Sequence, residues 1–197
     1  MEQEEINKLK NIDGQVRGVT LQTDAVFVTR KIGQDGVAKL QQKTKELGWE
    51  IDYKNVQITG WYPVGLRAFS LLCMKEAFGW GDKEMQEAGN DAPKYSFIAA
   101  MMMKYFISIR KVFNETPKYW EKHWRMGKLE PHELDELQKR MVLRIVNFKI
   151  HPVLCPYFLG YFKRIGEFAI KSEKIDIGET QCVWKGGPFD EFKLTWE

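Results

Sequence analysis

Two cysteines and two carboxylates near the end of the chain have spacings that suit a metal site. Cys155 precedes Glu179, Cys182 follows Glu179 by three positions, and Asp190 follows Cys182 by eight. Two thiolates and two carboxylates suit a four-coordinate zinc site. A hairpin that turns at residues 186–188 would bring Cys182 and Asp190 together. The alternative interpretation is that Cys155 and Cys182 are buried apolar thiols without a metal.

The composition sets the broad class of the protein. The 197 residues suit one globular domain, and three cysteines are an odd number for a disulfide scaffold, so we expect thiols in a reducing cytoplasm. A net charge of +3 with no Lys/Arg run argues against nucleic-acid binding. No apolar stretch approaches the roughly 18 residues of a spanning helix. The N-terminus is acidic, unlike a secretory signal.

Catalytic motifs are missing from the sequence. It contains no phosphate-binding loop, dinucleotide fingerprint, nucleophile elbow or H-E-x-x-H motif. His123, His132 and His151 do not pair with a cysteine or carboxylate at catalytic spacing. We therefore assign no catalytic residue.

One further motif belongs to haem-based nitric-oxide sensors, which combine Tyr-x-Ser-x-Arg with a proximal histidine. Tyr105, Ser108 and Arg110 come close to this pattern but are one residue out of register, on a predicted helix. We interpret the match as a coincidence.

Apolar periodicity and turn residues predict helices in the middle of the chain and strands at its end. Residues 1–13 form a polar lead-in, residues 24–32 fit a helix or a strand, and residues 49–61 link elements. Pro131 and the spacing after it favour a helix in 129–150, whereas the β-branched run 141–150 favours a strand. This segregation predicts an α+β fold. The predicted helices are 36–47, 63–78, 82–88, 93–113, 118–126 and 152–166, and the strands are 14–21, 168–175, 180–184 and 189–196.

The element order resembles that of the 4-vinyl reductase-type domain. The similarity rests on Tyr62-Pro63-Val64, on a Trp-bearing helix from Tyr119 to Gly127, on a Pro/Cys helix ending at Gly166, and on a closing strand with Phe192, Leu194 and Trp196. That domain shares its fold with TRAPP trafficking subunits and with the sensor region of phenol-responsive bacterial activators. Uncharacterised bacterial proteins of about 200 residues, described mainly from myxobacteria, are similar too.

The resemblance covers residues 14–197 and implies a single ligand-binding-type domain. It implies an antiparallel sheet of four to five strands with a helical layer on one face, and it favours strands around 133–150. Homodimerisation through helices is usual in that family.

The resemblance also implies the metal ligands. Phenol-sensing relatives hold a structural zinc through three cysteines and one glutamate. Cys155, Glu179 and Cys182 match the first three of these ligands, and Asp190 occupies the position of the last cysteine. The expected cofactor is therefore a structural zinc or none.

The ligand pocket of those relatives is lined by aromatic and aliphatic residues of the central helices. The matching region here contains Phe97, Met101, Tyr105, Trp120, Trp124, Tyr157, Phe158 and Tyr161.

These observations favour a module that binds or senses a small hydrophobic or aromatic molecule. No output domain is recognisable, so a sensor of this kind would act through a separate protein. Two alternatives stay open: a dimeric scaffold like the TRAPP subunits, and an enzyme related to tetrapyrrole vinyl reductases.

Overall fold

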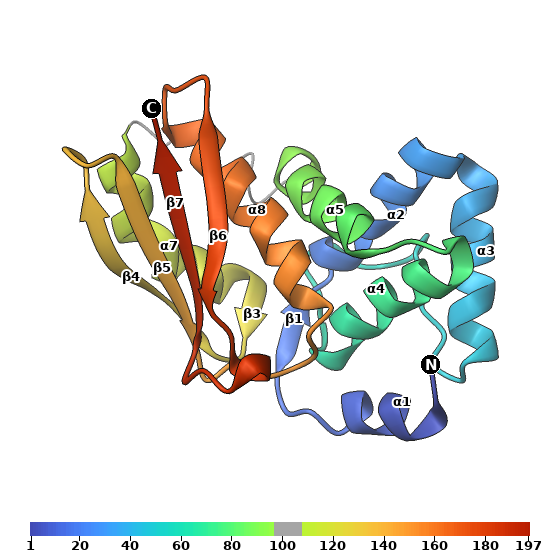
Figure 1. The fold of residues 1–197 in the computed structure, drawn as a ribbon. Coiled ribbons are helices and arrows are strands. Elements are labelled where there is room, and N and C mark those ends of the chain that lie inside the picture. The colour runs from blue at the N-terminus through green and yellow to red at the C-terminus, as the bar shows by residue number, and fades with distance from the viewer. Residues whose placement is uncertain (97–107) are drawn as a thin grey trace.

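The computed structural model describes residues 1–96 and 108–197 and has an α+β architecture. Helices α1–α5 form one part of the molecule, and a sheet covered by α7 and α8 forms the other (Figure 1). None of the described helices is long and apolar enough to cross a membrane. The elements are α1 (Gln3–Lys10), β1 (Gln15–Arg17), α2 (Val19–Ile32), α3 (Gln34–Glu46), β2 (Trp61–Pro63), α4 (Gly65–Phe78), α5 (Asp82–Tyr95), α7 (Ile109–His123), β3 (Trp124–Arg125), β4 (Lys128–Asp135), β5 (Arg140–Val146), α8 (Leu154–Ala169), β6 (Ile175–Gln181), the 3-10 helix η1 (Val183–Lys185) and β7 (Asp190–Trp196).

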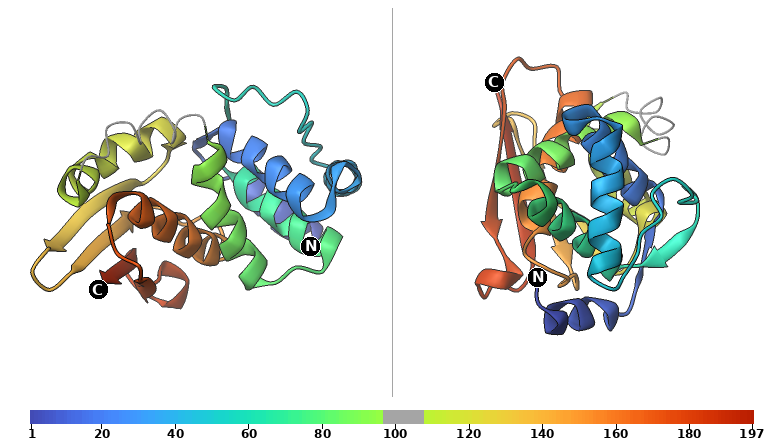
Figure 2. Two further views of the ribbon diagram at one scale, coloured as in Figure 1. Left: turned by 90° about the horizontal axis from the view of Figure 1, so that it is seen from above. Right: turned by 90° about the vertical axis from the view of Figure 1, so that its right-hand side faces the viewer.

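The larger sheet has four antiparallel strands in the order β4-β5-β7-β6. Its apolar face carries Met141, Leu143, Ile145, Phe192 and Leu194, all of them buried. Helices α7 and α8 cover this face (Figure 2, left). Side chains alternate along a strand, so the opposite face carries mainly polar residues such as Arg144, Glu191 and Lys193, together with Val142. The α+β class predicted from the sequence is confirmed.

A second sheet with the strand order β2-β1-β3 was not expected from the sequence. Its strands are short and join segments far apart in the chain, with Arg17 opposite Trp61 and Gln15 opposite Arg125. Val16 lies on the buried face of this sheet. Such short strands give no periodic signal in the sequence.

Helices α5 and α8 cross in close contact. A Cβ atom on Gly89 would lie 1.9 Å from the Tyr157 carbonyl oxygen, and one on Gly160 would lie 1.8 Å from that of Gln86. Only glycine permits this approach of the two backbones. The crossing fixes the position of α8, which carries Cys155.

The helical part begins earlier than the sequence patterns indicate. Residues 3–10 form α1, and its Ile6 and Leu9 are buried in the core, so the segment is not a loose lead-in. Residues 19–32 form one helix, which resolves the ambiguity at 24–32 and shortens the predicted strand 14–21 to β1.

The predictions around two prolines were wrong. Pro93 lies inside α5 and does not start a helix there, and residues 97–107 of the predicted helix 93–113 lie outside the described residues. Pro117 lies inside α7, where a proline lacks the N–H that would bond the carbonyl four residues earlier. That carbonyl, of Phe113, instead accepts a hydrogen bond from Thr116 Oγ1 at 2.8 Å, so the helix continues.

Strand predictions toward the C-terminus were partly right. The segment 129–150 forms the hairpin of β4 and β5, as the β-branched run indicated. The predicted strand 168–175 began too early, because residues 168 and 169 still belong to α8. The predicted strand 180–184 extended too far, because β6 ends at Gln181 and η1 begins at Val183. The closing strand 189–196 corresponds to β7.

Candidate metal centre

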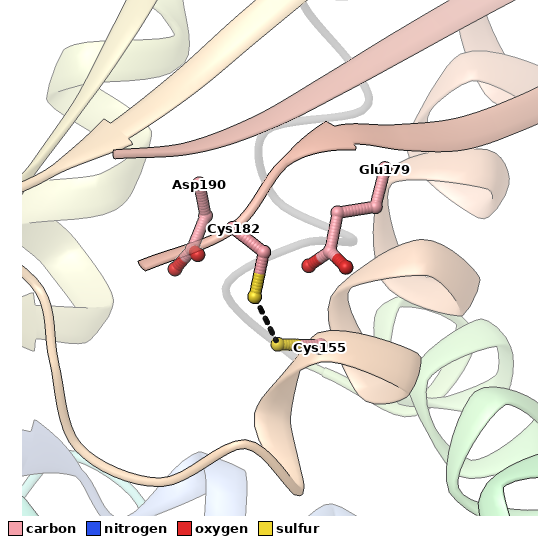
Figure 3. A group of neighbouring side chains, drawn as sticks. All are labelled: Cys155, Glu179, Cys182 and Asp190. Atoms are coloured by element: carbon pink, nitrogen blue, oxygen red, sulfur yellow. Dashed lines mark hydrogen bonds between the residues drawn. The ribbon is translucent and has the colours of Figure 1, made fainter. Parts of the chain in front are cut away.

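Cys155, Glu179, Cys182 and Asp190 come together from three parts of the fold (Figure 3). Cys155 lies in the first turn of α8, Glu179 near the end of β6, Cys182 directly after β6, and Asp190 at the start of β7. One donor atom from each residue lies within 4.8 Å of the others. The structure thus brings together all four residues that the sequence pattern singled out.

Local backbone structure explains how the β6–β7 connection places its donors. A register shift between Glu179 and Gln181 interrupts the pairing of β6 with β7. The carbonyl oxygen of Cys182 accepts the backbone N–H of Gly187 at 2.8 Å, which closes the turn. Asp190 Oδ1 accepts the N–H of Val183 at 2.8 Å. These bonds fix the Asp190 side chain relative to the backbone of Cys182 and Val183.

The sulfur atoms of Cys155 and Cys182 lie 3.7 Å apart, and both residues are free thiols. The Glu179 carboxylate points toward these sulfurs (Figure 3). Glu179 Oε2 accepts a hydrogen bond from Lys185 Nζ at 3.0 Å, whereas Oε1 is buried and has no hydrogen-bond partner among the described residues. Its side chain is only 8% exposed, so this oxygen lacks solvent as well.

The cluster is electrostatically unfavourable without a cation. Burial and the neighbouring Glu179 carboxylate raise the pKa of the Cys155 thiol far above its usual value. Burial also raises the pKa of Asp190, and Glu179 contributes to the shift. A buried group that lacks a counter-charge favours its neutral form. A divalent cation would reverse this preference and allow thiolate and carboxylate ligands to form.

One side of the cluster borders solvent. Cys155, Glu179 and Cys182 line an open groove together with Trp184, Lys185 and residues at the start of α5. An ion therefore has an entry path to the donor atoms.

The residues proposed for the ligand region are spread over several environments. Phe97, Met101 and Tyr105 lie outside the described residues. Trp120 and Trp124 stack with ring centroids 5.3 Å apart, and both contact Phe158 inside the main core. This part of the region is filled by its own side chains.

Tyr161 lines a small apolar cavity between α7, α8 and the sheet. Its hydroxyl donates to the Tyr119 hydroxyl at 2.9 Å. The cavity is small: its volume of about 20 Å³ is enough for about one water molecule.

A buried ion pair in the helical core was missed by the sequence reasoning. Arg67 on α4 is fully buried and pairs with Asp24 on α2. Asp24 also accepts from Ser70 Oγ at 2.7 Å, and Ser70 in turn bonds the Tyr53 hydroxyl at 2.8 Å. The Arg67 guanidinium lies over the ring of Tyr157, 4.2 Å from its centroid. Both charged residues sit in apolar helices, which gave no sign of their pairing.

Comparison with solved structures identifies the fold as that of H-NOX domains. An H-NOX protein from S. oneidensis in the Fe(II)NO ligation state superposes with a TM-score of 0.69, over 92% of this chain and 99% of that one, at 13% identity. An oxygen-binding H-NOX domain related to soluble guanylate cyclases gives 0.64, over 92% and 95%, at 14% identity. A mutant of T. Tengcongensis H-NOX also gives 0.64, over 92% and 97%, at 15% identity. At these identities the likeness establishes the fold alone.

No family model and no curated protein matches the chain. The resemblance to the 4-vinyl reductase and TRAPP domains is therefore wrong, because the H-NOX structures account for nearly the whole chain. We interpreted the near match of Tyr105, Ser108 and Arg110 to the motif of haem-based sensors as a coincidence. That interpretation set the H-NOX fold aside. The expected cofactor, a structural zinc or none, is corrected too, since haem is the cofactor named for structures of this fold.

His123, at the end of α7, has a ring nitrogen that could hold a haem iron. Its Nδ1 lies 3.1 Å from the Tyr119 carbonyl oxygen and must donate to it, so the neutral ring presents a bare Nε2. This Nε2 is buried and has no hydrogen-bond partner among the described residues. Burial lowers the pKa of His123 to about 4, so the ring is neutral at pH 7. A neutral imidazole held through its other nitrogen is the usual axial ligand of haem.

Proposed function

We propose that this chain is a ligand-binding sensory module with the H-NOX fold, and that Cys155, Glu179, Cys182 and Asp190 form a regulatory cation site that is separate from the cofactor of that fold. The observation that carries the proposal is the convergence of four donor atoms within 4.8 Å, with the buried Glu179 Oε1 unpartnered. A cation at the centre would satisfy this oxygen and stabilise the thiolates.

Such an ion would join elements that otherwise meet through side-chain packing. Cys155 belongs to α8, whereas Glu179, Cys182 and Asp190 belong to the β6–β7 region. A bound ion would therefore attach the start of α8 to the edge of the sheet. Occupancy would shift the equilibrium between two arrangements of α8, provided that the ion binds one of them better. The readout would come from a separate protein or from a second copy of the chain.

Titration with Co²⁺ tests this function, because its visible spectrum reports both tetrahedral geometry and sulfur coordination. The protein, freed of metal with a chelator, should bind one Co²⁺ with bands of a thiolate complex. Cys182→Ser should weaken these bands, because only the Cys155 thiolate remains, whereas Cys73→Ala should leave them unchanged, since Cys73 is buried in the helical core. Equal spectra for the Cys182→Ser variant and the unmodified chain would refute the site.

A second candidate function is haem binding, favoured by the free Nε2 of His123. It follows the cofactor named for H-NOX structures and fits the aromatic ligand predicted from the sequence. Haem would supply an iron that binds diatomic gases, and His123 would hold that iron while Tyr119 keeps the ring oriented. The cavity at Tyr119 is too small for haem as it stands, so the packing around α7 would have to open.

Haem titration separates this candidate from the metal centre. If the candidate is right, added haem gives a Soret band that shifts or disappears in His123→Ala. His132→Ala is the matched control, because the His132 side chain on β4 is exposed to solvent, whereas His123 is buried. A chain without a Soret band, or one whose band ignores His123, excludes this candidate and leaves the metal centre untouched.

A further inference from the structure

Two arginines contact the same tryptophan on one face of the small sheet, where Arg125 is exposed and Arg17 and Trp61 are half-buried. The guanidinium carbon of Arg17 lies 3.7 Å from the centroid of the Trp61 ring, and that of Arg125 lies 4.0 Å from it. Arg17 is on β1, Trp61 is its partner on β2, and Arg125 is on β3. Because these residues occupy the same face of the sheet, their side chains form one cationic and aromatic surface.

The arginines are held in place by neutral groups. Arg17 donates from Nε to the Lys122 carbonyl oxygen at 3.0 Å and from Nη1 to that of Thr59 at 2.7 Å. Arg125 donates from Nη1 to Gln15 Oε1 at 2.8 Å. Among the described residues, neither arginine has an acidic partner within ion-pair distance. The two charges are thus ordered by neutral acceptors and left without a counter-charge.

The close approach of like charges needs compensation. Both guanidinium carbons lie near one ring centroid, so the two positive charges are at most about 8 Å apart, which is within the screening length of physiological salt. Arg17 already uses Nε and Nη1, whereas the hydrogen bond of Arg125 uses Nη1 and leaves its Nε and Nη2 groups to match a carboxylate in parallel. Tryptophan and arginine are also the residue types that dominate binding energy at protein interfaces.

We infer that Arg17, Trp61 and Arg125 form a docking site for an acidic segment of a partner protein. Side-chain carboxylates of that segment would neutralise the two arginines, and its backbone or an apolar side chain would cover Trp61. The charge complementarity favours a short acidic stretch, because the surface offers two cations in a chain whose net charge is only +3. A nucleic acid needs a longer run of phosphate contacts. This inference does not depend on the metal centre.

A fluorescently labelled hexaglutamate peptide is the probe for this surface. We expect the full chain to bind it, with an affinity that falls as salt is added. Arg125→Gln should weaken binding at least tenfold, because Arg125 is exposed and its one hydrogen bond goes to a side chain. Lys128→Gln, which removes a charge on β4, is the matched control and should change the affinity less than twofold.

The Trp61 indole N–H signal in an NMR titration places the peptide at the site. We expect this signal to shift on peptide addition in the unmodified chain and to stay in place in Arg125→Gln. Three outcomes would overturn the inference: no hexaglutamate binding, equal binding by Arg125→Gln and the unmodified chain, or tighter binding of a thymidine oligonucleotide or tripolyphosphate than of the peptide.

Discussion

The sulfur atoms of Cys155 and Cys182 lie 3.7 Å apart although 27 positions separate the two residues in the chain. One sulfur comes from the start of α8 and the other from the residue directly after β6, so their distance reports how the helix sits on the sheet. Both remain thiols, and two carboxylates complete the cluster around them. This arrangement suits an ion that α8 and the sheet hold together.

Asp190→Asn should separate metal affinity from stability. The raised pKa of Asp190 means that its ionised form is disfavoured in the folded, metal-free chain, chiefly by burial. The amide keeps an acceptor for the Val183 N–H and removes that cost. At pH 7 the variant should therefore resist urea at least as well as the unmodified chain in chelator, yet bind Co²⁺ at least tenfold more weakly. Unchanged affinity would remove Asp190 from the ligand set.

Metal binding should release protons. The Cys155 thiol has a raised pKa in the absence of metal, because of burial and the Glu179 carboxylate, and it must ionise to become a ligand. The affinity for Co²⁺ should therefore fall as the pH falls from about 8 to about 6, by tenfold or more per pH unit. Calorimetry in two buffers of different ionisation enthalpy counts the protons. A pH-independent affinity would contradict ligation by the Cys155 thiolate.

Asp24→Asn should strongly destabilise the helical core. It would leave the fully buried Arg67 without its counter-charge, at a cost of about 3–5 kcal/mol. Asp91→Asn is the control, since Asp91 pairs with Arg30 at the surface and such pairs contribute about 1 kcal/mol or less. Urea unfolding of both variants gives the comparison, and equal losses would show that the buried pair has no special role.

His123 should make the fold acid-sensitive. Its folded pKa of about 4 lies below the ordinary 6.5, so its stabilising effect is complete above pH 6.5 and is lost as the pH falls toward 4. The loss should reach about 3 kcal/mol by pH 4. His123→Gln should flatten this part of the stability profile, whereas His132→Gln should not. Parallel profiles for His123→Gln and the unmodified chain would mean that the ring is not buried.

Gly160→Ala should disturb the crossing of α5 and α8. The new methyl group would meet the Gln86 carbonyl oxygen at 1.8 Å, so the helices must separate at a cost of about 1–3 kcal/mol or more. Gly178→Ala is the control, because a Cβ at that strand position meets no atom within 4 Å. Comparable unfolding free energies for the two variants would show that the backbones are not in close contact.

The sequence supported some of these features for physical reasons. The turn at residues 186–188 is local, so the spacing of Cys182 and Asp190 predicted their approach, and the α+β class followed from element order. The family assignment failed because a similar order of helices and strands occurs in unrelated folds. Long-range features left no sequence signal: the pairing of Arg17 with Trp61, and of Asp24 with Arg67, depends on how the helices and the small sheet assemble.

X-ray absorption at the cobalt edge of the Co²⁺-loaded chain tests the central claim most directly, because it counts the atoms bound to the ion. The proposed metal centre predicts a first shell of two sulfur and two oxygen atoms, from Cys155, Cys182, Glu179 and Asp190, with one sulfur fewer in Cys155→Ser. A first shell of oxygen and nitrogen without sulfur would contradict it.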